Sequence, residues 1–132
     1  MQAGIKIRVM VVDDSPSMRE MALRVLREDF ELLICENGLD AIAALGEFRP
    51  DIIFVDIVMP KLDGYETVAL IRMNEAFSEV PILMISSKGG VFDVARGRLL
   101  GFSGSIVKPF KSEILRGAIA EHLGADVPAA AA

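Results

Sequence analysis

Five short apolar runs alternate along the chain with longer amphipathic segments, and this alternation constrains the fold more than any other feature. The runs are Ile7–Val12, Leu32–Cys35, Ile52–Val55, Ile82–Ile85 and Ser105–Val107. Their length and their Val and Ile content suit strands that are buried on both faces. Strands that alternate with helices pack as a parallel sheet with helices against it. The sequence therefore predicts an α/β fold with a five-stranded parallel sheet and helices on both faces.

Helical periodicity and capping residues predict helices between the runs. Ser15 followed by Pro16 is a favourable start for the first helix, because Ser caps and Pro fits the first turn. Asp63 and Glu66 have the spacing of a capping box for the third helix. Apolar residues at helical spacing supply buried stripes for the first and last helices: Met18, Met21, Ala22, Val25 and Leu26, then Ile114, Leu115, Ala118, Ile119 and Leu123.

The length of 132 residues and the hydrophobic fraction of 52% fit one globular domain. We assign residues 1–123 to this domain and expect 124–132, which are small and featureless, to be a flexible tail or the stub of a linker. The single cysteine, Cys35, excludes an intramolecular disulfide and is predicted to be a buried core residue. No signal peptide is expected, since Lys6 and Arg8 interrupt the early apolar stretch, and a cytoplasmic location is expected by default.

Charge and hydropathy argue against two kinds of partner. The formal net charge is −5 and no basic stripe is present, so we expect no nucleic-acid partner, because phosphate neutralisation requires clustered Lys and Arg. No apolar run approaches the roughly 20 residues of a membrane-spanning helix, so we expect no membrane partner.

Polar residues directly follow four of the five runs, where functional side chains gather in an open parallel sheet. They are Asp13 and Asp14, Asp56, Ser86 and Ser87, and Lys108. Ligands of such sheets bind at the carboxyl ends of the strands, so we expect these side chains to converge on one edge.

Each of these residues also has an ordinary structural explanation. An Asp after a strand often caps a helix, and a Ser there can bond to backbone. Three carboxylates together are harder to explain, because close carboxylates repel one another unless a cation is present. Mg²⁺ accepts a few carboxylates together with water and phosphate oxygens. Asp13 to Pro16 offers no glycine-rich loop, which argues against a dinucleotide or P-loop site.

The motifs in their order resemble the receiver domains of the response-regulator family, which act in two-component signalling. The resemblance covers roughly residues 6–123 and rests on Val11–Ser15, Asp56–Pro60 with Asp63 and Gly64, Ser86 and Ser87, and Lys108–Phe110. It implies the flavodoxin-like (βα)5 receiver fold. It also implies a signalling domain that is not an enzyme beyond its own phosphorylation and dephosphorylation.

The resemblance also implies roles for individual residues. Asp56 is the phosphoacceptor for a histidine kinase. Asp14, Asp56 and the backbone carbonyl of Val58 bind Mg²⁺, and Asp13 holds the metal through a water. In addition, Ser86 and Lys108 contact the phosphoryl group, Ser87 is small and leaves the pocket open, and the Lys108–Pro109 peptide is cis.

One position departs from the family pattern and affects the expected output. Many receivers carry Tyr or Phe where this chain has Ser105, so we expect no ring movement in the fifth strand. We expect the signal to pass through the loop Ser87–Gly90 and the following helix, with Phe92 and Phe102 as reporters. The downstream protein is expected to bind the face formed by the fourth helix, fifth strand and fifth helix.

Three other functions compete with a switch that binds a protein partner. A phosphorelay intermediate, which passes the phosphoryl group to a histidine phosphotransfer domain, shares every site residue. A Mg²⁺-dependent phosphatase usually needs an acid two residues after its nucleophile, where this chain has Val58. A docking module without phosphorylation leaves the acidic set unexplained. The stretch Ser86–Asp93 also resembles chemotaxis-type receivers that govern twitching or gliding motility.

Overall fold

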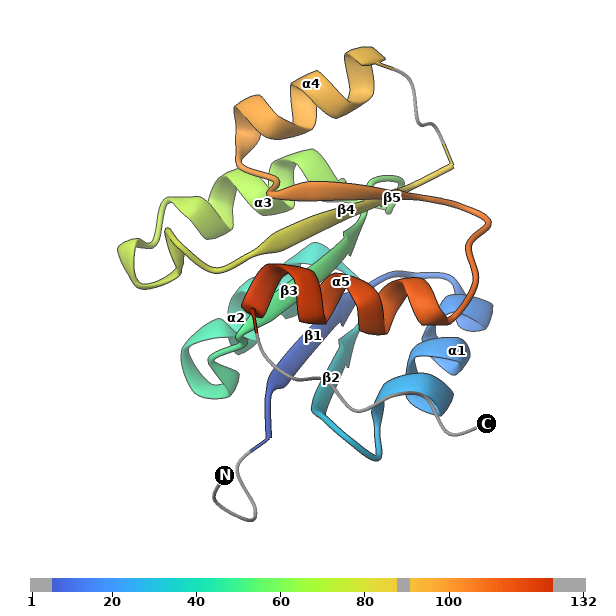
Figure 1. Ribbon diagram of the computed structural model, residues 1–132. Coiled ribbons are helices and arrows are strands. Elements are labelled where there is room, and N and C mark those ends of the chain that lie inside the picture. The colour runs from blue at the N-terminus through green and yellow to red at the C-terminus, as the bar shows by residue number, and fades with distance from the viewer. Residues whose placement is uncertain (1–5, 88–90, 125–132) are drawn as a thin grey trace.

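A computed structural model describes residues 6–87 and 91–124 of the protein, and it confirms the predicted α/β fold (Figure 1). Five parallel strands form one sheet in the order β2-β1-β3-β4-β5. The strands are β1 (Arg8–Val12), β2 (Glu31–Cys35), β3 (Ile52–Asp56), β4 (Ile82–Ser86) and β5 (Gly104–Val107). The helices are α1 (Pro16–Leu26), α2 (Gly38–Phe48), α3 (Gly64–Arg72), the short 3-10 helix η1 (Glu75–Phe77), α4 (Val91–Leu100) and α5 (Glu113–Leu123).

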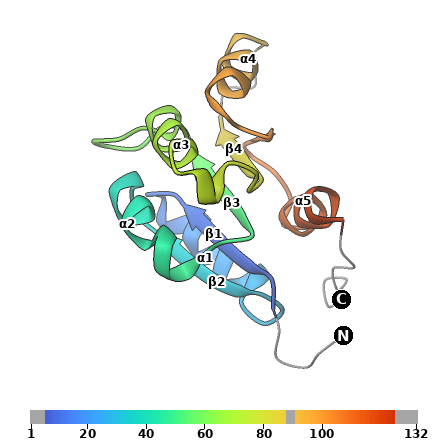
Figure 2. The same ribbon diagram turned by 90° about the vertical axis from the view of Figure 1, so that its left-hand side faces the viewer.

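The helices cover the sheet from both sides and produce two apolar cores (Figure 2). Helices α1 and α5 pack on one face, over Val9, Val11 and Phe54. Helices α2 and α3 pack on the other, over Met10 and Val55. Alternate residues of β1 and β3 thus point into different cores, which explains why those strands are apolar throughout. The edge strand β2 is only partly buried.

The helix starts follow the predicted capping residues. The Ser15 hydroxyl accepts a hydrogen bond from the Met18 amide at 3.4 Å, and Pro16 occupies the first turn of α1. The Asp63 carboxylate accepts from the Glu66 amide at 2.8 Å, and Glu66 accepts from the Asp63 amide at 3.1 Å. This reciprocal pair is a complete capping box, and it fixes the start of α3 directly after the β3 loop.

A partly buried arginine at the end of α3, Arg72, forms hydrogen bonds near the start of β4. Arg72 donates to the carbonyl oxygens of Gly101, Phe77 and Val80 at 2.9, 2.7 and 2.6 Å. Burial lowers the pKa of Arg72, since desolvation disfavours its charged form. The residue joins the carboxyl end of α4, which Gly101 follows, to the start of β4. None of the helices in the described part of the chain is both long and apolar enough to cross a membrane.

Candidate functional site

The structure brings three predicted acids together at the carboxyl ends of β1 and β3. Asp13 is fully buried and Asp56 is almost so, whereas Asp14 is exposed. One carboxylate oxygen from each lies within 4.8 Å of the other two. Asp56 is the last residue of β3, and Asp13 directly follows the last residue of neighbouring β1. The sheet therefore holds these two acids next to each other.

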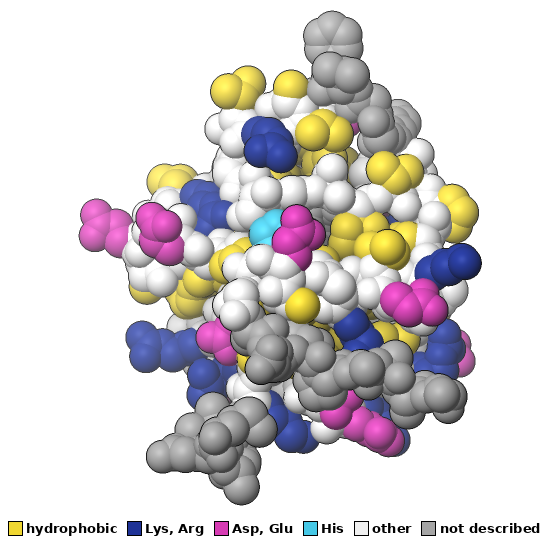
Figure 3. Space-filling view, in the orientation of Figure 1, with side chains coloured by type: hydrophobic (Ala, Val, Ile, Leu, Met, Phe, Trp, Pro, Cys, Tyr) yellow, Lys and Arg dark blue, Asp and Glu magenta, His cyan; other side chains and the backbone are white. Residues whose placement is uncertain are grey.

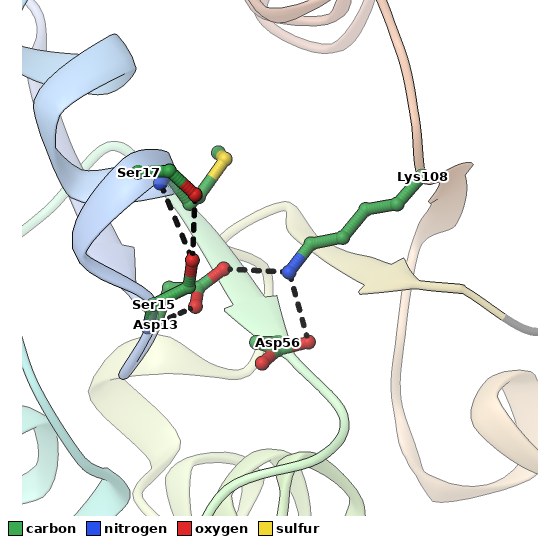
Figure 4. Close-up of polar contacts among 6 residues, drawn as sticks. Asp13, Ser15, Ser17, Asp56 and Lys108 are labelled. Carbon is green, nitrogen blue, oxygen red and sulfur yellow. Dashed lines mark hydrogen bonds and ion pairs between the residues drawn. The ribbon is translucent and has the colours of Figure 1, made fainter.

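Lys108 reaches the same cluster from the end of β5 (Figure 4). Its Nζ atom lies 3.2 Å from Oδ2 of Asp13 and 3.6 Å from Oδ1 of Asp56. The Lys108 amide donates to the Ser86 carbonyl at 2.8 Å, which joins the end of β5 to β4. The Lys108–Pro109 peptide is cis, as the family resemblance implies. One cation therefore lies between two buried carboxylates that come from different strands.

Local backbone contacts fix the position of Asp13, whereas Asp14 is exposed to solvent. The Asp13 carboxylate accepts from the Ser15 amide at 2.8 Å, while its own amide donates to the Cys35 carbonyl at 3.0 Å. Asp13 is therefore held on both sides before α1 begins.

Cys35 is buried, as predicted, and burial raises the pKa of its thiol to about 11, so it is not a reactive thiolate.

The electrostatics of the cluster favour a bound cation. Burial, followed by the charge of Asp13, raises the pKa of Asp56 from its ordinary value of 3.8 to about 6, although Lys108 and the Val58 amide act in the opposite direction. Among the described residues, Lys108 is the one cation that forms ion pairs with these acids, and its single charge does not compensate three converging carboxylates. A hard dication with oxygen ligands would do so, and the acidic donor set fits Mg²⁺.

We expect the Asp56 carboxyl to titrate near pH 6 in the absence of divalent cations and at lower pH when Mg²⁺ is added. The metal-free folded state binds this proton more tightly than the unfolded chain. Asp56 therefore contributes stability below its ordinary pKa of 3.8, and this contribution is lost as the pH rises toward 6. Carbon-13 NMR of the side-chain carboxyl measures the midpoint directly. A midpoint that Mg²⁺ leaves unchanged would contradict a metal site at Asp56.

The remaining predicted site residues lie around this cluster at different depths. Ser86 is buried at the end of β4, next to β3, and Ser87 is exposed. Val58 is 68% exposed, and its backbone amide donates to the Asp56 carboxylate. Ser105 is exposed on β5. Lys88, Gly89, Gly90 and the side chain of Phe92, which the expected output route involves, lie outside the described residues.

Three close approaches near the site were not predicted from the sequence. A Cβ atom at Gly64 would lie 2.4 Å from the carbonyl oxygen of Asp56, so only glycine allows α3 to start against this loop. Tyr65 is buried between α3 and α4, where its hydroxyl lies 3.5 Å from an oxygen of the Asp93 carboxylate. The Arg96 guanidinium lies 4.2 Å from the centre of the Tyr65 ring. In the sequence, the adjacent pair Asp63 and Gly64 was the only signal for the close approach of Gly64 to Asp56.

Comparisons with known sequences agree with this geometry. The family profile described as the response regulator receiver domain matches residues 9–120. The chain is 45% identical to Protein PilG of Pseudomonas aeruginosa over 123 residues, which cover 92% of this chain and 91% of PilG. It is 35% identical to the chemotaxis protein CheY of Halobacterium salinarum, over 89% of this chain and 98% of CheY. It also matches the DNA-binding response regulator MtrA of Mycolicibacterium smegmatis at 37% identity, but spans only 46% of that relative.

Comparisons with solved structures lead to the same family. Chemotaxis protein CheY4 of Vibrio cholerae superposes with a TM-score of 0.85 at 31% identity, and the match covers 89% of this chain and 98% of CheY4. The order of the strands, the acidic cluster and the profile match thus agree. The chain belongs to the response regulator receiver domain family of two-component signalling.

Proposed function

We propose that this domain accepts one phosphoryl group on Asp56 from a histidine kinase and thereby changes its binding to a protein partner. The observation that carries the proposal is the meeting of Asp13, Asp14, Asp56 and Lys108 at one edge of the sheet. Phosphoryl transfer depends mainly on positioning and on neutralising the charge of the phosphoryl oxygens, and this cluster is suited to both.

Each residue has a defined task in the transfer. The ionised Asp56 carboxylate attacks phosphorus, a P–O bond forms, and the P–N bond to the donor histidine breaks. The ammonium group of Lys108, already 3.6 Å from Asp56, attracts the oxygens of the incoming group. Asp14, Asp56 and the Val58 carbonyl would hold Mg²⁺, with Asp13 behind a water, and the bound ion supplies further positive charge to the phosphoryl oxygens.

The change in binding begins with the new charge at the end of β3. A phosphoryl group on Asp56 adds a dianion beside Ser86, whose hydroxyl is a suitable donor at the end of the neighbouring strand. Ser87 is small and leaves room for this group. Movement of Ser86 would carry with it the loop that leads into α4. The responding surface is then the face formed by α4, β5 and α5, where the downstream protein binds.

Direct chemical labelling tests the proposed function. The full chain is incubated with Mg²⁺ and a small-molecule phosphodonor such as acetyl phosphate, and intact mass is measured. We expect a gain of one phosphoryl group that requires Mg²⁺ and is lost after treatment with hydroxylamine, which cleaves acyl phosphates. A chain that never gains this mass, although NMR shows it folded, would overturn the proposal.

Asp14→Ala is expected to weaken Mg²⁺ binding more than Asp13→Ala, because we place Asp14 in direct contact and Asp13 behind a water. The exposed position of Asp14 and the existing contacts of Asp13 with Lys108 and the Ser15 amide support this order. Loss of a direct carboxylate ligand should cost about tenfold or more in affinity, as even outer contacts commonly do. Calorimetric titration with Mg²⁺ measures both variants. Equal losses would show that the two roles are assigned wrongly.

Val58→Asn is expected to shorten the lifetime of the phosphoryl group. Hydrolysis requires a water in line with the bond between Asp56 and phosphorus. The apolar side chain of Val58, exposed at this edge, cannot hold such a water by a hydrogen bond, whereas an amide can. Decay of labelled protein after removal of the donor measures the rate, and Val58→Leu is the control that changes size without adding polarity. Decay of the wild-type label within seconds would contradict the predicted slow loss.

A further inference from the structure

Helix α4 packs more loosely than α3, the helix beside it. Among the α4 residues whose burial the structure describes, Gly97 alone is buried, and Val94 and Leu100 reach the apolar core only in part. Helix α3, by contrast, buries five of its nine residues. Figure 3 shows apolar side chains exposed at the top of the molecule, where α4 lies, and Leu99 of this helix is 88% exposed. A helix with few buried contacts can shift at a low cost in free energy.

A single side chain of α3, Tyr65, contacts the amino half of α4. Tyr65 is buried, and its hydroxyl lies 3.5 Å from both the carbonyl oxygen and a carboxylate oxygen of Asp93. Three residues further along α4, the Arg96 guanidinium lies 4.2 Å from the centre of the Tyr65 ring. The same ring meets Phe102 edge to face, with ring centres 6.5 Å apart. Tyr65 therefore holds two residues in one turn of α4.

These contacts are weak enough to break when α4 moves. Hydroxyl distances of 3.5 Å are longer than the roughly 2.5–3.0 Å of a strong O–H···O hydrogen bond. Arg96 is exposed, and a cation–π contact at an exposed site changes an equilibrium by only about two- to fivefold. Burial, followed by the charge of Asp93, raises the pKa of Tyr65, so the phenol stays protonated and remains a donor. The contacts bias the position of α4 without fixing it.

Tyr65 is also placed to respond to changes at Asp56. It directly follows Gly64, where a Cβ atom would lie only 2.4 Å from the Asp56 carbonyl oxygen. The Gly64 amide donates to the Ile57 carbonyl at 2.8 Å, so the start of α3 is bonded to the loop after β3. Ser86, the last residue of β4, precedes α4 in the chain. Tyr65 thus lies between the loop that follows Asp56 and the helix that follows Ser86.

We propose that Tyr65 is a positioning residue, which holds the amino half of α4 against α3 while Asp56 is unmodified and releases it when Asp56 is phosphorylated. This inference rests on the proposed function and adds to it a residue that sets the balance between the two states. A phosphoryl group draws Ser86 toward the end of β3, and the amino half of α4 then leaves Tyr65. Because the contact exists in one state only, it opposes the modification, and its removal favours the modified state.

The composition of the chain makes Tyr65 its own probe, because it is the only tyrosine and there is no tryptophan. The intact chain is studied with Mg²⁺ alone and with Mg²⁺ plus beryllofluoride, a mimic of the phosphoryl group. We expect beryllofluoride to increase the quenching of tyrosine fluorescence by acrylamide, since departure of Asp93 and Arg96 exposes the ring. Unchanged quenching, while fluorine-19 NMR shows bound beryllofluoride, would overturn the proposal.

Affinity for beryllofluoride separates this role from a merely structural one. Tyr65→Phe removes the hydroxyl and keeps the ring, and Arg96→Gln removes the cation above it. Each variant should bind beryllofluoride about two- to fivefold more tightly than wild type, although each should unfold at a lower temperature. A side chain that only stabilises the fold would lower the melting temperature without this gain. Affinities in both variants that equal or fall below the wild-type value contradict the proposal.

Arg98→Gln is the matched control for Arg96→Gln. Both arginines are exposed on α4, and each change takes the formal charge from −5 to −6 by removing one cation. The control should leave the affinity unchanged, and an equal gain in both would show a general effect of charge and refute the role of Tyr65.

Labelling of the wild-type chain by acetyl phosphate distinguishes the two proposals. A chain that takes no label and binds no beryllofluoride refutes the proposed function and, with it, the release of α4. A chain that does both, without a response at Tyr65 or in its variants, refutes the role of Tyr65 alone.

Discussion

Asp56→Asn is expected to lower phosphoryl labelling by about 100-fold or more, as removal of an essential nucleophile commonly does. The amide has nearly the same shape but supplies no anionic oxygen to attack phosphorus. The fold should survive, because the environment of Asp56 already opposes its charge and raises its pKa to about 6. A neutral side chain at this position relieves repulsion from Asp13. Intact mass after incubation with acetyl phosphate and Mg²⁺ measures the effect.

A matched carboxylate elsewhere shows whether the loss is specific. Asp40 is exposed in the first turn of α2, and Asp40→Asn should leave labelling unchanged. Peptide mapping of the labelled wild-type chain should recover the phosphoryl group, or its stable reduction product, on Asp56. Labelling of Asp56→Asn at the wild-type level would place the acceptor on a different residue.

Gly64→Ala is expected to lower the free energy of unfolding by about 1–3 kcal/mol, the usual cost of forcing extra atoms into a packed site, and to slow labelling. The added Cβ would lie 2.4 Å from the Asp56 carbonyl oxygen and 2.7 Å from Cα of Ile57. Both are backbone atoms, so either α3 or the end of β3 has to move. The amide of Gly64 also donates to the Ile57 carbonyl at 2.8 Å, and this movement would stretch that bond.

Urea unfolding followed by circular dichroism measures the loss of stability, and initial labelling rates measure the effect on the site. Gly46→Ala is the control, because its Cβ would meet nothing within 4 Å and alanine favours helix. It should stabilise the domain slightly and leave labelling unchanged. A Gly64→Ala chain as stable as wild type would mean that the start of α3 does not constrain the loop that follows Asp56.

Much of this architecture could be predicted because its signals are local. Runs of Val and Ile identify buried strands, and Asp63 with Glu66 identifies a helix start that the structure contains in full. The meeting of Asp13, Asp56 and Lys108 was also predictable, since the ends of parallel strands share one edge of the sheet.

The features that escaped prediction depend on contacts between distant segments. Strand β2 begins at Glu31 and strand β5 at Gly104, each one residue before its apolar run, because ladder pairing with neighbouring strands extends past the hydrophobic pattern. The hydrogen bond of Arg72 to Gly101 connects residues 29 positions apart, and no spacing in the sequence indicates it.

The hydrogen bond of Arg72 to Gly101, directly after α4, holds the carboxyl end of that helix. Helix α4 has ten residues, so it is about 15 Å long at roughly 1.5 Å per residue. Because its carboxyl end is held at Gly101, we expect a tilt of the helix to leave that end nearly in place. A tilt of about 10° would then move the amino end of α4 by about 2–3 Å. That end lies on the side of Asp56 and Ser86. We therefore expect a displacement at the carboxyl ends of the strands to move the amino end of α4 more than its carboxyl end.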